Sequence, residues 1–138
     1  MVPQNPEEQS QPADCPFCTP APATVILETP TCRILWDNYP VSPGHALIVP
    51  KAHIADWFAA PPDLQAELAA LIEAAKAAID KHHQPDAYNV GFNAGAAAGQ
   101  TVFHLHIHVI PRYAGDSQDP RGGVRWVIPG KADYWGDA

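Results

Sequence analysis

Three histidines occupy alternate positions of one apolar run, Gln100 to Arg112, in a chain of 138 residues. Successive side chains of a β-strand point to opposite faces, so His104, His106 and His108 would share one face and the apolar residues between them the other. The apolar face can enter a core, which leaves the imidazoles in a row on a face that need not be buried. Pro111 closes the run because proline cannot donate a ladder hydrogen bond. Since imidazole serves as nucleophile, acid, base or metal ligand near neutral pH, the row predicts chemistry.

The other patterns predict one α+β domain with an antiparallel sheet of about five strands. Short β-prone runs are separated by turn-forming residues, and the strands we expect are 24–28, 31–36, 45–49, 87–93 and the histidine run. Apolar side chains recur at helical spacing over 63–82, at Leu64, Leu68, Leu71, Ile72, Ala75 and Ile79. This stripe predicts one long helix packed on one face of the sheet.

Composition and charge exclude several classes of protein. The net charge is −7, with 15 acidic against 8 basic residues, which argues against broad electrostatic binding to nucleic acid. No run approaches the roughly 18 apolar residues of a membrane span, and residues 1–13 are acidic and proline-rich where a secretion signal would be basic and then apolar. We therefore expect a cytoplasmic protein with a disordered tail over 1–13 and no nucleic-acid or membrane partner.

Two of the three cysteines, Cys15 and Cys18, form a C-x-x-C pair. An odd number of cysteines without a secretion signal argues against a disulfide framework, which leaves a metal half-site, a redox pair or coincidence. Proline-rich coil surrounds the pair in place of the strand and helix of a redox motif. Metal binding is favoured, provided that two further ligands exist elsewhere. Cys32 lies in an apolar run and is expected to be a buried small hydrophobe.

Taken together, these motifs resemble the histidine-triad (HIT) family of nucleotide hydrolases and transferases. The resemblance is carried by the C-x-x-C pair, by G-H-x-L-x-x-P-K-x-H over 44–53 and by G-Q-x-x-x-H-x-H-x-H-x-x-P-R over 99–112. It implies a HIT-like fold with a short second helix, a HIT domain over 14–113 and a C-terminal extension over 114–138 that packs on the domain or on a partner subunit. Family members of this type pair as homodimers through the long helix and a shared sheet.

The resemblance also implies a mechanism. The middle histidine of the triad is the family's nucleophile, which corresponds to His106 here. A neutral imidazole can attack an α-phosphorus and form a nucleotidyl-histidine, which divides one hard displacement into two easier ones. His108 corresponds to the histidine that contacts phosphate and is suited to protonating the leaving group, and His45 to the remaining active-site histidine. The transferase branch usually has Gln in place of His108, so hydrolysis of a purine nucleoside phosphoramidate or dinucleoside polyphosphate to a nucleoside monophosphate is favoured.

Further residues match substrate contacts of the family. Asp37 and Asn38 fall where ribose hydroxyls are bound, although both are also ordinary turn residues. Trp126 is a candidate for contact with the base or the leaving group, and packing of the tail onto the domain is an equally good reading. The remaining predicted contacts lie in or near a glycine-containing loop whose backbone can approach a phosphate closely: Asn93, Gly99, Gln100 and Thr101.

Some family members hold a structural zinc ion with two N-terminal cysteines, the histidine of P-K-x-H and the first histidine of the triad. These map onto Cys15, Cys18, His53 and His104. Structural zinc requires a closed tetrahedral set of this Cys₂His₂ kind. His104 would then anchor the metal and leave His106 free to react.

Other classes of function stay open at this point. A nucleotide-binding or scaffold protein with little turnover would not need a nucleophile at His106, and a nucleotidyltransferase would carry a different residue at His108. A metal-dependent hydrolase could use the triad itself as ligands. Such sites generally include carboxylates, and none lies within seven residues of the triad in sequence.

Overall fold

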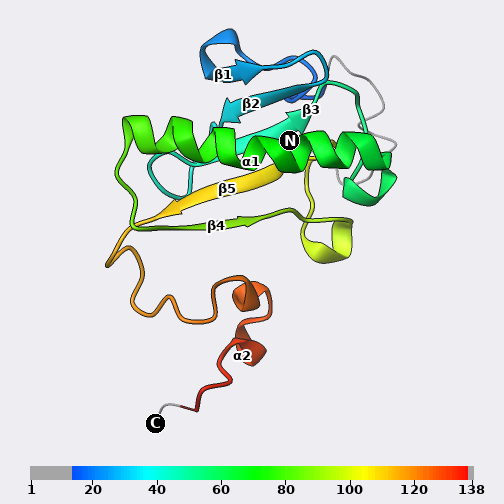
Figure 1. The fold of residues 1–138 in the computed structure, drawn as a ribbon. Helices are drawn as coiled ribbons and strands as arrows, with labels where there is room; N and C mark the ends of the chain where they lie inside the picture. Colours follow the sequence, from blue (N-terminus) through cyan, green and yellow to red (C-terminus); the bar gives the residue numbers. More distant parts are fainter. Residues whose placement is uncertain (1–13, 137–138) are drawn as a thin grey trace.

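The computed structural model describes residues 14–136, so the predicted tail over 1–13 lies outside the described residues. Five antiparallel strands form one sheet in the order β1 (Val25–Glu28), β2 (Cys32–Trp36), β3 (Ala46–Pro50), β5 (Ile107–Arg112) and β4 (Ala87–Gly91). The long helix α1 (Pro62–His82) crosses one face of this sheet, and a short helix α2 (Pro129–Ala132) lies near the C-terminus (Figure 1). The predicted α+β fold is confirmed. None of the helices over 14–136 is long and apolar enough to cross a membrane.

The main core lies between α1 and the sheet. Leu68, Ala75 and Ile79 of α1 are buried, and Leu64, Leu71 and Ile72 pack against the same cluster, as the helical stripe predicts. Cys32 is fully buried in this core, which confirms the expectation for that residue. Pro62 suits the first turn because its missing N–H would have no helical partner, and Pro85 follows shortly after the helix ends.

The opposite face of the sheet carries a smaller apolar cluster of Leu35, Leu47 and Val49. Phe17 and Val25 pack against it, so the N-terminal segment that contains the cysteines covers this face. The segment has little regular structure apart from the 3₁₀ turn η3 (Pro22–Thr24). The two faces therefore differ in kind: one is sealed by a long helix and the other by a short irregular segment.

The prediction of one strand through all three triad histidines was wrong for His104 and His106. β5 begins at Ile107, so only His108 lies in a strand. The ladder with β3 ends at the pair Ile48–Ile107. Beyond this pair, Pro50 has no N–H, and its carbonyl lies 2.8 Å from the His104 Nε2 atom. His104 is consequently fully buried and does not stand in an exposed row.

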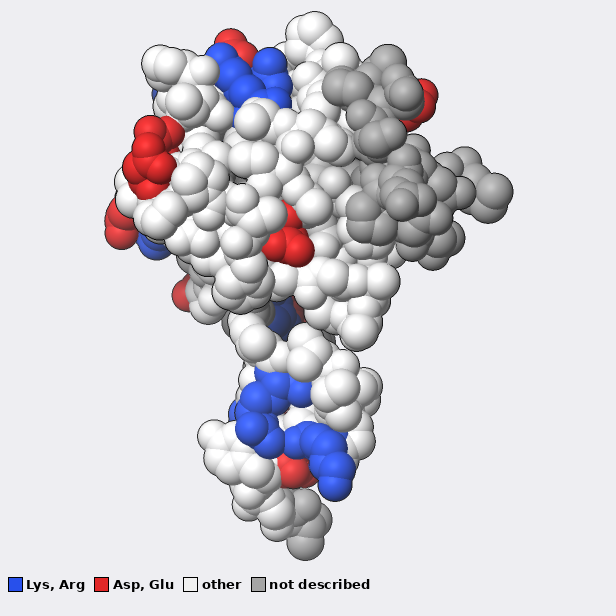
Figure 2. Space-filling view, turned by 90° about the vertical axis from the view of Figure 1, so that its right-hand side faces the viewer, with Lys and Arg blue, Asp and Glu red and all other residues white. Residues whose placement is uncertain are grey.

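The C-terminal extension leaves β5 and lies beyond the edge strand β4 (Figure 1). Figure 2 shows it as a separate lobe joined to the domain by a narrow waist, with basic side chains on the face in view. Its 3₁₀ turn η6 (Gly123–Val127) and α2 are held by internal contacts. Arg125 donates to the carbonyls of Lys131 and Ala132, and the Trp126 indole N–H donates to the Arg121 carbonyl at 2.6 Å.

Candidate active site and metal centre

His106 is held in one tautomer by the backbone. Its Nδ1 atom lies 2.7 Å from the carbonyl oxygen of His104. A carbonyl only accepts, so Nδ1 carries the proton and Nε2 keeps its lone pair. Burial lowers the pKa of His106, against the opposing effects of the His104 carbonyl and the Asp37 charge. The ring is therefore mostly neutral at pH 7, with a nucleophilic nitrogen at Nε2.

His108 is held in the opposite tautomer through His45. The Val41 backbone N–H donates to Nδ1 of His45 at 3.1 Å, which leaves the proton of a neutral His45 on Nε2. That Nε2 lies 2.9 Å from Nδ1 of His108, which accepts, so the proton of a neutral His108 is on its Nε2. Burial, aided by the charges of His106 and His45, lowers the pKa of His108 to about 4. His108 thus offers an N–H where His106 offers a lone pair.

Asp37 brings a carboxylate to the triad that the sequence did not show. Its Oδ2 lies 3.4 Å from Nε2 of His45, and its Oδ1 accepts from the Tyr39 backbone N–H at 2.8 Å. The donor atoms of Asp37, His45 and His108 all lie within 4.8 Å of one another. The cluster does not fit a metal ion, however, because the Val41 N–H fixes the proton of His45 on the nitrogen that would have to coordinate.

Two pockets meet at His45 and His108. A pocket of about 290 Å³, here called the cysteine-side pocket, is lined by the N-terminal segment, by the end of β2 and by His106. It contains the predicted contacts Asp37, Asn38 and Thr101. A pocket of about 460 Å³, here called the extension-side pocket, lies between β4 and η6 and contains the predicted contacts Asn93 and Trp126.

Gln100 and Gly99 occupy a loop held by its own hydrogen bonds. The Gln100 side chain is buried, its Oε1 accepts from the Gly95 N–H at 2.8 Å, and its amide donates to the carbonyls of Ala55 and Val102. Gly99 has a φ of 95° and its N–H donates to the Ala96 carbonyl, closing the turn η5 (Ala96–Ala98). Neither residue lines the two pockets. Their predicted contact with substrate stays a prediction, and their visible role is to shape the loop.

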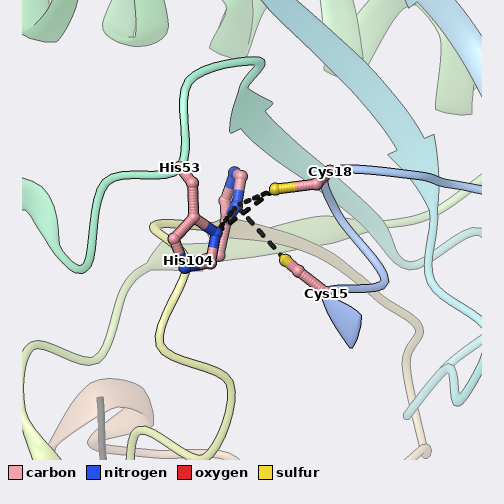
Figure 3. Close-up of side chains that lie close together, drawn as sticks. All are labelled: Cys15, Cys18, His53 and His104. Atoms are coloured by element: carbon pink, nitrogen blue, oxygen red, sulfur yellow. Dashed lines mark hydrogen bonds between the residues drawn. The ribbon is translucent and has the colours of Figure 1, made fainter. Parts of the chain in front are cut away.

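The four predicted zinc ligands come together from three separate parts of the chain (Figure 3). The Nδ1 atom of His104 lies 3.4 Å from the Cys15 sulfur and 3.5 Å from the Cys18 sulfur. The Nδ1 atom of His53 lies 3.2 Å from the Cys18 sulfur and 3.1 Å from Nδ1 of His104. Tetrahedral zinc with ordinary bond lengths separates its ligand atoms by about 3.3 to 3.8 Å, and these four separations are close to that range.

The surroundings of the four ligands also fit zinc. The His104 Nε2–H donates to the Pro50 carbonyl, which turns the lone pair of Nδ1 toward the other ligands. Burial and the neighbouring Cys15 raise the pKa of Cys18 to about 11 in the protein without metal. Arg33 opposes this rise, and one of its guanidinium nitrogens is buried without a partner among the described residues. A cationic group beside the cysteines favours the thiolates that zinc binds.

Comparison with known proteins agrees with this geometry. The model of the HIT domain matches residues 19–115. This chain belongs to the HIT family. The adenylylsulfatase HINT3 of Arabidopsis thaliana is 39% identical over 103 residues, which are 72% of this chain and 52% of that protein, so the match spans about half of that relative. An uncharacterized HIT-like protein of Mycobacterium tuberculosis is 37% identical over 80% of this chain and 79% of its own.

Solved structures of HIT proteins confirm the fold. A zinc-bound histidine triad family protein from Mycobacterium smegmatis superposes with a TM-score of 0.70 at 38% identity, covering 79% of this chain and 82% of that one. A HIT family protein from Bacillus anthracis gives a TM-score of 0.68 at 33% identity over 75% and 76% of the two chains. Sequence and fold therefore agree on membership of the HIT family.

The motifs of the HIT family did not reveal two features of this site. The backbone groups that fix the tautomers, the Val41 N–H and the His104 carbonyl, have no side-chain signature. Phe17 packs on the His106 ring with ring centroids 4.9 Å apart and lines the cysteine-side pocket. Its position between the two cysteines was the available signal, because a residue there must lie beside any metal that they bind.

Proposed function

We propose that this HIT protein is a nucleotide phosphohydrolase that acts at an α-phosphorus through a nucleotidyl-histidine at His106. The observation that carries the proposal is the opposite protonation of two neighbouring imidazoles. His106 presents a lone pair at Nε2, and His108 presents an N–H at Nε2. Both line the cysteine-side pocket, so one substrate can meet a nucleophile and a proton donor together.

The reaction follows from these two groups. Nε2 of His106 attacks the α-phosphorus, a P–N bond forms, and the bond from phosphorus to the leaving group breaks. The leaving group departs with the electron pair of that bond and takes a proton from the His108 Nε2–H. Water then attacks the phosphorus and gives a proton to Nε2 of His108, which restores the neutral imidazole. The P–N bond to His106 breaks with its electron pair left on Nε2 of His106, and a nucleoside monophosphate leaves. The Val41–His45–His108 hydrogen-bond chain keeps the donor aligned in both steps.

The shape of the cysteine-side pocket suits a nucleoside. Phe17, Leu35 and Leu47 give it apolar walls for a base, in keeping with the expected preference for a purine. Asp37 also lines this pocket, and its carboxylate can accept hydrogen bonds from ribose hydroxyls. The extension-side pocket receives the leaving group, and its walls include Phe92, Val90 and Trp126.

The lining of the pockets favours a phosphoramidate over a dinucleoside polyphosphate. Among the described residues that line the two pockets, none is Lys or Arg. A polyphosphate chain carries several negative charges and would meet no cation there, whereas a phosphoramidate has a single charged phosphate and an apolar or amine leaving group. Adenylyl sulfate is a third substrate to compare, because one relative is named an adenylylsulfatase.

Zinc has a structural role in this proposal. Cys15, Cys18, His53 and His104 would hold the ion, which would cross-link the N-terminal segment to the domain when bound. We expect a cytoplasmic location, where free thiols persist. The alternatives are a binding protein with little turnover and a nucleotidyltransferase. The presence of His106 in a reactive tautomer favours the enzyme over the binding protein.

We infer that the protein works as a homodimer. β4 is an edge strand, whose free backbone groups can pair with a second copy. The extension beside it exposes apolar side chains, with Val124 exposed by 66%, Val127 by 73% and Ile128 by 59%. Light scattering should give the mass of two chains, and Val127→Asp should shift it toward one, while Lys131→Asp in the same lobe leaves it unchanged. A monomer for the unaltered protein would refute the dimer.

The activity is tested by the release of nucleoside monophosphate from adenosine phosphoramidate, diadenosine polyphosphate and adenylyl sulfate. The unaltered protein should turn over the phosphoramidate fastest, and His106→Ala at equal zinc content should bind AMP without turnover. Equal binding by both proteins and turnover by neither would replace the hydrolase with a nucleotide-binding protein. Product transferred to a second phosphate acceptor faster than to water would favour the transferase.

A further inference from the structure

We propose that the Cys15–Cys18 segment is a wall shared by the metal centre and the nucleotide pocket, in which Phe17 positions the His106 ring. Metal binding would thereby set the affinity for nucleotide. The inference rests on the proposed function in one respect, since it takes the cysteine-side pocket to be the nucleotide pocket. It makes Phe17 a positioning residue and links a structural ion to substrate binding.

One side of the segment faces the metal centre and the other faces the cysteine-side pocket. The sulfur of the buried Cys15 and the sulfur of Cys18 face the two histidine ligands (Figure 3). The two residues between them, Pro16 and Phe17, line the cysteine-side pocket. Because only these two residues separate the ligands, an ion that fixes both sulfurs also fixes the direction of the Phe17 side chain.

Phe17 connects this wall to the nucleophile. Its ring centroid lies 4.9 Å from that of His106 and 5.8 Å from that of His104, the latter edge to face at 74°. His104 is itself a metal ligand in the proposed set, and its carbonyl orients His106. The metal centre thus reaches His106 by two routes, through the backbone of His104 and through the Phe17 ring.

The rest of the N-terminal segment offers few other anchors. Between residues 14 and 24 its regular structure is the short turn η3, and the hydrogen bonds of Thr19 and Thr24 stay within the segment. The core beneath α1 is formed by residues beyond the segment. Loss of the ion should therefore loosen the pocket wall and leave the sheet and α1 folded.

The test is AMP binding by calorimetry, which requires no turnover. We expect chelation of the unaltered protein to raise the dissociation constant for AMP by at least about tenfold, with the far-ultraviolet circular dichroism retained. Phe17→Ala should do the same with its zinc content unchanged, and Phe17→Leu should recover part of the affinity. Phe58→Ala removes an exposed ring outside both pockets and should leave the affinity unchanged.

Chelation of the Phe17→Ala variant tests whether the metal acts on nucleotide binding through Phe17 or independently of it. If the metal acts on nucleotide through this wall, chelation weakens binding by the variant far less than it weakens binding by the unaltered protein. The inference would be overturned if the unaltered protein bound AMP equally well with and without metal. It would also be overturned if chelation and Phe17→Ala weakened binding independently, so that their fold-changes multiplied. Either result would leave the proposed function standing. If chelation unfolds the protein, metal-loaded Phe17→Ala and Phe17→Leu still decide the role of Phe17. Failure of the metal-loaded unaltered protein to bind AMP would overturn the proposed function and this inference with it.

Discussion

The Nε2 atom of His45 lies 2.9 Å from the Nδ1 atom of His108, and this contact fixes which nitrogen of His108 carries its proton. The chain of hydrogen bonds starts at a backbone N–H, that of Val41, which cannot change its protonation. The donor and the nucleophile of the proposed reaction are therefore both set by backbone groups. The Asp37 carboxylate, 3.4 Å from the same Nε2 atom of His45, favours the same tautomer.

His108→Ala should slow the enzyme according to the leaving group. With an amine leaving group, which must gain a proton, we expect a loss of about 10² to 10⁴ in turnover, the usual contribution of a general acid. With a p-nitrophenyl ester of the same nucleotide the loss should be far smaller, because that leaving group departs unprotonated. The measurement is kcat for both substrates. Equal losses would remove His108 from the role of proton donor.

Stability should fall in mild acid because of His108. Its pKa is about 4 in the folded protein and about 6.5 in the unfolded chain, so the unfolded chain binds more protons between these values. The contribution is fully present above pH 6.5 and is lost as the pH falls toward 4. Urea unfolding at pH 7 and pH 5 should show His108→Gln losing less stability than the unaltered protein, by about 1 to 2 kcal/mol. An identical loss in both proteins would contradict the lowered pKa.

Zinc content should depend on Cys18 and be independent of Cys32. Cys18→Ala removes one of the four converging ligands, so metal analysis should find much less than the one ion per chain expected for the unaltered protein. Cys32→Ala removes a buried sulfur from the core and should keep the ion. Chelation should lower the melting temperature of Cys32→Ala and leave that of Cys18→Ala unchanged. If the unaltered protein holds no zinc and chelation does not change its melting temperature, the metal centre must be abandoned.

Gln100→Ala should lower the stability of the protein and have little effect on catalysis. The side chain makes three hydrogen bonds to backbone groups in a buried position, so its loss should cost about 1 to 3 kcal/mol of unfolding free energy. Kinetics at a temperature where the variant is folded should show a change in KM or kcat well below that of His108→Ala. A large loss of turnover at unchanged stability would instead support the predicted contact of Gln100 with substrate.

The sequence was sufficient for the elements and for the main chemical groups. Strand bounds came within two residues for four of the five strands, since alternating patterns and Pro- or Gly-containing turns are local signals. The convergence of Cys15, Cys18, His53 and His104 could be anticipated because all four lie in recognisable motifs. Local patterns could not show where β5 begins, because the backbone N–H of Leu105 donates to the carbonyl of Ile54, a residue distant in sequence, and the ladder with β3 ends at Ile107.

Features that depend on contacts between distant parts of the chain could not be predicted from the sequence. No carboxylate lies near the triad in sequence, yet Asp37 approaches His45 in space because β2 and β3 pair side by side. Gln100 belongs to a family motif, but its burial and its contacts with Ala55 and Val102 appear only in the fold. The position of Phe17 beside His106 depends on the N-terminal segment, which packs on the face of the sheet opposite α1. Each of these needed the tertiary structure.

The central claim is that His106 forms a covalent bond to the α-phosphorus, and intact-protein mass spectrometry tests it most directly. The protein is mixed with adenosine phosphoramidate and quenched within the first turnovers. The account predicts an added adenylyl group on the unaltered protein, mapped to His106, and no added mass on His106→Ala. Steady turnover with no adenylyl-protein at any quench time, or an adenylyl group on another residue, would contradict the account.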